Sequence, residues 1–219
     1  MDLKIERVDL TYKSNFADPQ FSLLSAPRVL HFLFVKLKEF GVRSSDLKME
    51  GNISNLPEFS ITCTLPGLNS VLRIRVDALE LNAFAPAVAN TPPVSKIAGA
   101  ALAALKDIGG AAFSGTLLHE VVWAAHGTPS VPAMDYLRGF LSPNVPAPPS
   151  GLAFTLNPDQ SVGRQSANVA VALSAVVPKG LYLQINAGYD GRLSTEEVRV
   201  GFGTTISATL DMLNITQPK

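Results

Sequence analysis

Hydrophobic and polar residues alternate along much of the chain, and stretches of helical periodicity interrupt that alternation. Residues 3–13 are predicted to form a strand, because Val8, Leu10 and Tyr12 share one face with Glu6 while the other face is polar. A helix is expected to begin at Ser25, a candidate N-cap with Pro27 in the first turn, and to end at Gly41. Three strand-like runs and a second helix are predicted next, at residues 47–53, 59–65, 71–83 and 96–108.

The second half of the chain repeats this order. Ser130 and Pro132 have the spacing of Ser25 and Pro27, and each pair opens an apolar helical segment. The second half is expected to contain a strand, a helix, three strands, an optional further strand and a last helix, at residues 116–125, 132–141, 152–156, 168–177, 181–187, 197–202 and 205–213.

The repeated order predicts an α+β protein made of two similar halves. Each half is predicted to be β-α-β-β-β-α, over residues 1–112 and 113–219, and the two are expected to pack as one pseudo-symmetric unit. Because helices do not alternate with single strands, we expect an antiparallel sheet with helices on one face. This element order resembles the duplicated arrangement of the TATA-box-binding fold and, more loosely, the helix-grip folds. The resemblance implies an arrangement of elements and carries over no functional residue.

The helix predicted over residues 27–40 carries apolar side chains on two sides. One face consists of Val29, Leu30, Leu33, Phe34, Leu37 and Phe40. Phe32 and Val35 lie on the opposite side, beside Arg28 and His31. When this helix is aligned with the second-half helix at their Ser-x-Pro starts, Phe32 matches a position on the apolar face of the second helix. The alignment therefore predicts that the side with Phe32 faces the sheet and that something else covers the Leu33 side. In either orientation the helix needs cover on two sides, from the sheet and from the rest of the chain, another subunit or a ligand. Our candidate partner interface is Arg28, His31, Phe32 and Val35.

Charge is scarce, which narrows the classes of partner. The chain has 18 Lys and Arg against 18 Asp and Glu, and 16% of its residues are charged, compared with about 25% in soluble domains. Nucleic-acid binding is not expected, because a neutral chain lacks the basic field that holds a phosphate backbone, and Arg73 and Arg75 have no basic counterpart in the equivalent run of the second half. The single cysteine, Cys63, excludes an intrachain disulfide and a multi-cysteine zinc site, and its strand context predicts a buried thiol.

The sequence contains no motif for a known reaction, cofactor or metal. His119 and His126 are seven residues apart in a predicted strand, whereas the zincin motif needs two histidines four apart on a helix. Glu120 and His126 share one face of that strand but lie about 20 Å apart, too far for a catalytic contact, so these residues are interpreted as polar groups of an edge and a loop. A nucleophile elbow, a phosphate loop and a dinucleotide fingerprint are absent, and neither a cofactor nor a metal is expected.

These observations favour a non-catalytic function. The first residues lack the apolar stretch of a signal peptide, and the longest small-apolar run, residues 97–105, falls short of the ~20 residues of a membrane span, so we expect a cytoplasmic location. Low charge, the missing catalytic motifs and the two-sided first helix predict an interaction or assembly protein that forms a homo-oligomer or binds a protein partner. The alternative is a small-molecule or lipid-binding protein, or an enzyme, with an apolar cavity between sheet and helices.

Overall fold

Within the described part of the chain, nine strands form one sheet in which every neighbouring pair is antiparallel. The computed structural model describes residues 1–52, 54–56, 58–65, 69–84, 94–140 and 150–217. The strands are β1 (Leu3–Phe16), β2 (Leu47–Glu50), β3 (Ser60–Leu65), β4 (Ser70–Ile74), β5 (Ala78–Phe84), β6 (Thr116–Pro129), β7 (Gly151–Leu156), β8 (Arg164–Leu173) and β9 (Leu181–Asp190). The helices are α1 (Ala26–Leu37), α2 (Val94–Gly109), α3 (Ala133–Arg138) and α4 (Thr195–Met212). None of these helices is both long and apolar enough to cross a membrane.

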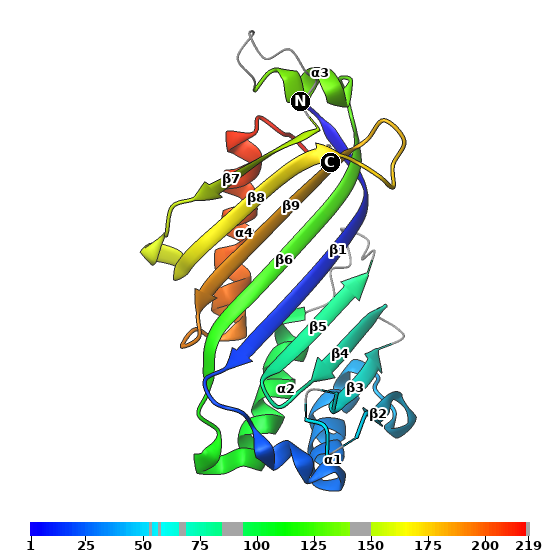
Figure 1. Ribbon diagram of the computed structural model, residues 1–219, viewed down its shortest axis with the longest axis vertical. Coiled ribbons are helices and arrows are strands. Elements are labelled where there is room, and N and C mark those ends of the chain that lie inside the picture. Colours follow the sequence, from blue (N-terminus) through cyan, green and yellow to red (C-terminus); the bar gives the residue numbers. More distant parts are fainter. Residues whose placement is uncertain (53, 57, 66–68, 85–93, 141–149, 218–219) are drawn as a thin grey trace.

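Sheet and helices form two layers, which confirms the expected α+β class with an antiparallel sheet. Figure 1 shows α1, α2 and α4 behind the sheet, while the opposite face of the strands is turned toward the viewer. Burial alternates accordingly along β9, where Leu183 and Ile185 are fully buried and Gln184 and Asn186 are accessible. One face of the sheet therefore forms the core, and we call the other its open face.

The central pair, β1 and β6, joins the two halves of the chain. The strand order is β2-β3-β4-β5-β1-β6-β9-β8-β7. β1 and β6 run side by side from Leu3, opposite Pro129, to Phe16, opposite Thr116. On each side of this pair the next strand is the last one of its own half, β5 or β9, and the remaining strands continue outward in reverse chain order.

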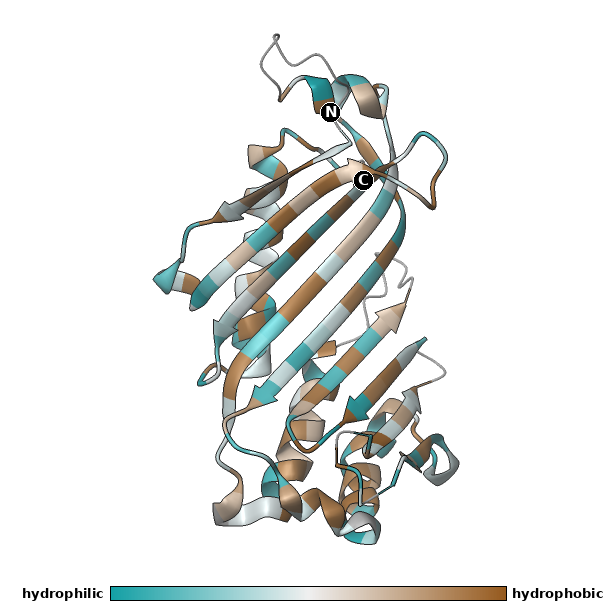
Figure 2. Cartoon of the chain, viewed as in Figure 1, coloured by the Kyte–Doolittle hydropathy of each residue, from teal (hydrophilic) through white to brown (hydrophobic). Residues whose placement is uncertain are grey.

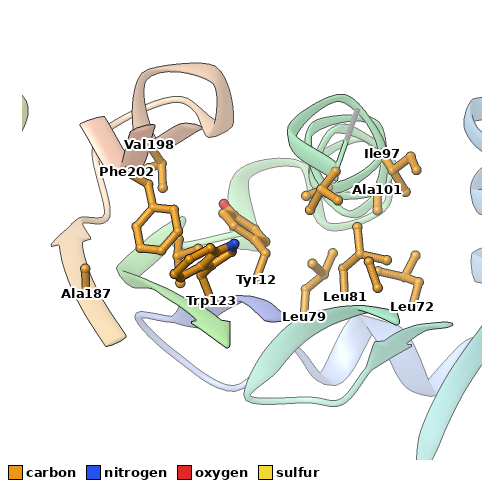
Figure 3. Packing of buried hydrophobic residues seen from close by; sticks show 14 of the residues in the cluster. Tyr12, Leu72, Leu79, Leu81, Ile97, Ala101, Trp123, Ala187, Val198 and Phe202 are labelled. Atoms are coloured by element: carbon orange, nitrogen blue, oxygen red, sulfur yellow. The ribbon is translucent and has the colours of Figure 1, made fainter. Parts of the chain in front are cut away.

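Two groups of apolar side chains fill the space between sheet and helices (Figure 3). The group beneath α2 is fully buried and includes Leu72, Leu79, Leu81, Ile97 and Ala101. The group beneath α4 includes Trp123, Ala187, Val198 and Phe202. Tyr12 of β1 lies between them and is itself buried, so a single core extends under both helices. Each large apolar side chain buried there contributes about 1.5–3 kcal/mol relative to exposure.

A glycine allows the start of α4 to approach α2 closely. A Cβ atom added at Gly99 would lie 2.9 Å from Thr195 Oγ1, closer than side chains normally approach. One turn earlier, the Ser95 hydroxyl donates a 3.0 Å hydrogen bond to the Glu196 carboxylate at the start of α4. The missing side chain at position 99 therefore determines how near the two helices come.

Several predicted elements have different bounds in the structure, among them the strand expected at 168–177, which is β8 (Arg164–Leu173), and the last helix expected at 205–213, which is α4 (Thr195–Met212). Residues 71–83 form parts of two strands, because the chain turns between β4 and β5, where the Arg75 N–H donates to the Ala78 carbonyl at 2.8 Å. The helix expected over residues 132–141 is the shorter α3, which buries only Ala133 and Leu137. Positions 53 and 141, at the ends of predicted elements, lie outside the described residues.

The optional strand at residues 197–202 is wrong, because this segment belongs to α4. Val198, Val200 and Phe202 alternate as they would in a strand, but a capping box before them starts a helix. Ser194 Oγ accepts a hydrogen bond from the Glu197 N–H at 3.2 Å, and the Glu197 carboxylate accepts one from the Ser194 N–H at 2.7 Å. These reciprocal bonds satisfy backbone donors that only a helical start leaves free.

Candidate interaction surfaces

The open face of the sheet is a polar surface whose side chains interact laterally. The Thr11 hydroxyl on β1 donates to Asn82 Oδ1 on β5 at 2.7 Å. Charges of opposite sign succeed one another across β6, β1, β5 and β4, in the row Glu120, Lys13, Glu80 and Arg73. Figure 2 shows the alternation of hydrophilic and hydrophobic residues along these strands. Because the charges alternate, this row presents no field of one sign to a partner.

A shallow hollow of about 320 Å³ lies on the open face over β7, β8 and β9. The side chains that point to this face are uncharged: Ala153, Thr155, Asn168, Ala170, Gln184 and Asn186. The Thr155 hydroxyl donates to Asn168 Oδ1 at 2.9 Å. Such a surface offers hydrogen-bond donors and acceptors without charge.

The outer strand β7 has no charged residue and no proline, the residues that often protect a sheet edge. Its sequence is Gly151-Leu152-Ala153-Phe154-Thr155-Leu156. Every residue of β7 pairs with β8, and within the described residues no strand pairs with its other side. At the opposite edge, β2 has only four residues and includes Lys48 and Glu50. Short, charged strands are typical of protected edges, so only β2 of the two has such protection.

The inward face of β7 is incompletely covered. Leu152, Phe154 and Leu156 pack against the core but are only half-buried. Val169 and Val171 of the neighbouring strand β8 are fully buried. The apolar row of β7 therefore lies at the margin of the core, and a strand placed beside it would bury it further.

A buried polar cluster lies at the centre of the sheet. His119 is on β6 and only 1% exposed, which corrects its interpretation as an edge residue. Its Nδ1 lies 2.7 Å from the Tyr12 hydroxyl and 2.9 Å from the Ser14 hydroxyl, and its Nε2 lies 3.1 Å from the Leu193 carbonyl oxygen. Because a carbonyl only accepts, Nε2 carries the proton and Nδ1 accepts from a hydroxyl. The cluster thus ties the central strands to the turn before α4.

Burial determines the protonation states in this cluster. It lowers the pKa of His119 because the imidazolium is poorly solvated, while the Leu193 and Gly191 carbonyls and Asp190 act in the opposite direction. It also raises the pKa of Tyr12, against the effect of the hydrogen bond from Ser14. Histidine beside serine can form a nucleophile and its base, but Ser14 is fully buried and lines neither cavity near the cluster. The arrangement offers no accessible nucleophile.

Two cavities lie beside the place where the first turns of α2 and α4 meet, and Thr195 lines both. One has a volume of about 270 Å³, and its lining includes Lys106, Phe113, His119 and Thr195. The other has a volume of about 80 Å³ and an almost entirely apolar lining that includes Leu10, Val121, Val198 and Phe202. The second occupies the place expected for a ligand cavity, but sites for drug-sized molecules usually measure about 300–1,000 Å³.

The four candidate interface residues lie on the outward side of α1. The helix buries the side formed by Val29, Leu33 and Leu37. The aligned serine–proline starts predicted the opposite orientation, with Phe32 toward the sheet, and that prediction is wrong. Phe32 is half-buried, with the Arg28 guanidinium 5.7 Å from its ring centroid and the His31 ring 5.9 Å away, and Val35 is 42% exposed. An intermolecular contact of these four residues stays a prediction.

Two other reactive or charged groups are buried in the core. Cys63 on β3 is 1% exposed, which confirms the expected buried thiol, and desolvation together with Asp46 raises its pKa to about 12. Arg164 donates to Thr205 Oγ1 at 3.1 Å and to the Asn157 carbonyl at 2.9 Å. Neither group lines one of the three cavities described above.

The unprotected edge is the feature that sequence reasoning missed. The run 151–156 alternates like any other strand, and its missing charge was the only available signal. In the described part of the chain, no three His, Cys, Asp or Glu side chains are placed to hold a metal ion together. A comparison with known protein families and with curated proteins found no match for this chain.

Proposed function

We propose that the protein is a non-catalytic assembly protein that forms a homo-oligomer through its sheet. The observation that carries this proposal is β7, an uncharged outer strand with a half-buried apolar row and no described partner on its outer side. In a monomer the backbone N–H and C=O groups of such an edge can pair with a strand of another chain. In a homo-oligomer they pair with a second copy of the same chain. The formal net charge of +0 adds no long-range repulsion between copies.

The buried polar cluster at His119 supports the non-catalytic part of this proposal. Tyr12, Ser14 and His119 bind one another beneath the helices, and each is at most 3% exposed. His119 borders the larger of the two cavities near α2 and α4, and Tyr12 borders the smaller one. Ser14, the side chain that could act as a nucleophile beside a histidine, borders neither of them. The geometry therefore favours a role for this cluster in folding.

The second candidate function is the binding of a small apolar molecule between sheet and helices. The observation in its favour is the cavity of about 80 Å³ beside Val121 and Phe202. A cavity of this size suits only a few heavy atoms, so a lipid would need the helices to separate. Native mass spectrometry that found a monomer with a bound small molecule would favour this candidate over assembly.

We further propose that the chain is an internal duplication with halves 1–112 and 113–219. The order β1-β5-β4-β3 in the first half follows the same scheme as β6-β9-β8-β7 in the second, and β2 is then an added outer strand. Superposition of these two sets in an experimental structure should bring α2 onto α4. Different helix positions after superposition would contradict the duplication.

A cytoplasmic location fits the proposal. The only cysteine is a free, buried thiol, so the fold needs no oxidising compartment. Fractionation of the source cells tests this location, and recovery of the protein with membranes or in the medium would contradict it.

Sedimentation velocity over a range of concentrations tests the assembly function. The wild-type chain should reach twice the mass of one chain as its concentration rises. Thr155→Lys puts a charge on the exposed side of β7, and we expect it to move this transition to higher concentration. The matched control is Thr64→Lys, the same change at an exposed position of β3, which has partner strands on both sides.

The outcomes separate the edge from other surfaces. A wild-type chain that stays monomeric at every concentration would refute the assembly function. Equal shifts in the two variants would show that association depends on charge and not on the edge strand.

A further inference from the structure

We infer that β7 pairs with β7 of a second copy, antiparallel, about a two-fold axis at Phe154, so that one sheet continues through both copies. This inference rests on the proposed assembly function and deepens it by fixing the partner, the strand and the register. The side of β7 that pairs with no other described strand supplies the backbone donors and acceptors, and a second β7 supplies their complements.

Symmetry restricts the registers that such a pair can adopt. A two-fold axis between antiparallel edge strands stands perpendicular to the sheet, because only then do both strands lie in one sheet. It keeps the helix layers of the two copies on the same side. Residues that face each other then belong to the same face of the strand, so the axis passes through a residue position and not between two residues.

An axis at Phe154 places every apolar side chain of the row formed by Leu152, Phe154 and Leu156 opposite an apolar side chain of the second copy. With the axis there, Phe154 lies opposite its own copy, and Leu152 lies opposite Leu156 of the second copy. On the open face, Ala153 lies opposite Thr155. All three half-buried apolar side chains thereby gain an apolar neighbour across the new strand pair.

The two neighbouring centres leave part of this row without an apolar partner. With the axis at Ala153, Leu156 would lie opposite the exposed Ser150. With the axis at Thr155, Leu152 would lie opposite Pro158, which has no N–H to donate to the ladder. Hydrophobic matching and backbone bonding therefore select Phe154.

A second copy is favoured over a strand from another protein because β7 is complementary to itself. No charge on the strand needs an opposite charge on a partner, and its side chains match in the two-fold arrangement. The open-face residues beside the axis, alanine and threonine, are small enough to leave the new ladder unobstructed.

Cysteine cross-linking tests this register. Residues directly opposite in an antiparallel pair have Cα atoms about 4.5–5.5 Å apart, within the disulfide range of about 4.4–6.8 Å. Phe154→Cys should therefore cross-link to itself under mild oxidation and give a band at twice the chain mass. Leu152→Cys is the matched control on the same face, because two copies of it would be four residues out of register, roughly 13 Å apart along the strand. Cys63 is buried and should leave the wild-type chain uncross-linked.

A second measurement tests the same register if the Phe154→Cys chain does not fold. Ala153→Cys and Thr155→Cys change exposed residues, and a mixture of the two chains should cross-link across the open face. Each chain alone should cross-link less, because its own cysteines lie on a diagonal about 7–8 Å apart.

The outcomes distinguish the register from the assembly itself. If the wild-type chain dimerises and Thr155→Lys weakens the dimer, but neither Phe154→Cys nor the mixture cross-links, the register is wrong and the assembly function stands. Cross-linking of Leu152→Cys alone would likewise overturn the register. A wild-type chain that is monomeric at every concentration overturns both the assembly function and the register. This holds also if β7 is then found to bind a strand from a different protein.

Discussion

Acidification should destabilise the protein through His119. In the unfolded chain its pKa is about 6.5, and burial lowers it in the folded chain. Between these two values the unfolded state binds more protons, so stability is full above pH ~6.5 and falls as pH decreases toward the folded pKa. One such group changes the free energy of unfolding by at most about 1.4 kcal/mol per pH unit. His126 contributes in the same direction, because desolvation and then Arg7 lower its pKa as well.

Urea unfolding of the His119→Gln chain isolates the contribution of His119. At pH 7.5 the variant should lose about 1–3 kcal/mol, because the buried Tyr12 hydroxyl, which accepts from Ser14, loses the Nδ1 atom to which it donates. From about pH 7.5 to 5.5 the wild-type chain should lose up to about 1.4 kcal/mol more than the variant. His126→Gln is the control. This variant retains His119, so it should still lose more stability on acidification than His119→Gln does. Equal losses in the wild-type and His119→Gln chains would show that His119 does not titrate differently in the folded state.

Two further predictions concern helix starts and surfaces. Ser194→Ala removes the capping hydroxyl of α4 and should lower the free energy of unfolding, measured by urea titration, by about 1 kcal/mol. An unchanged free energy of unfolding would show that the capping box does not stabilise the protein. Phe32→Glu should reduce oligomer mass or partner binding, measured by light scattering, while circular dichroism shows an intact fold. Unfolding of that variant would show that the fold depends on the packing of Phe32, and no change at all would show that neither the fold nor a contact with a partner depends on it.

Local sequence patterns were sufficient for the individual elements. Alternation over residues 3–13 and 181–187 predicted strands that became β1 and β9, because one face of each meets the core and the other does not. The proline after Ser25 and the left-handed Gly41 bound the first helical segment, since both act within a few residues of the chain. Local patterns failed at residues 197–202, where a two-residue period of apolar side chains coincided with a helix start.

The arrangement of those elements was decided only by the tertiary structure. Alternation assigns a side chain to a face but does not say which strand lies beside it, so the sequence could not show that β7 is an outer strand or that His119 sits in the central one. The same limit applies to α1, which has apolar residues on two sides and turns the Leu33 side inward because α2 and the sheet lie there. Edges, buried polar clusters and helix orientations depend on contacts between residues far apart in the chain. The sequence by itself therefore determined most of the strands and helices, and the folded sheet determined which strands lie at its edges and which side chains are buried.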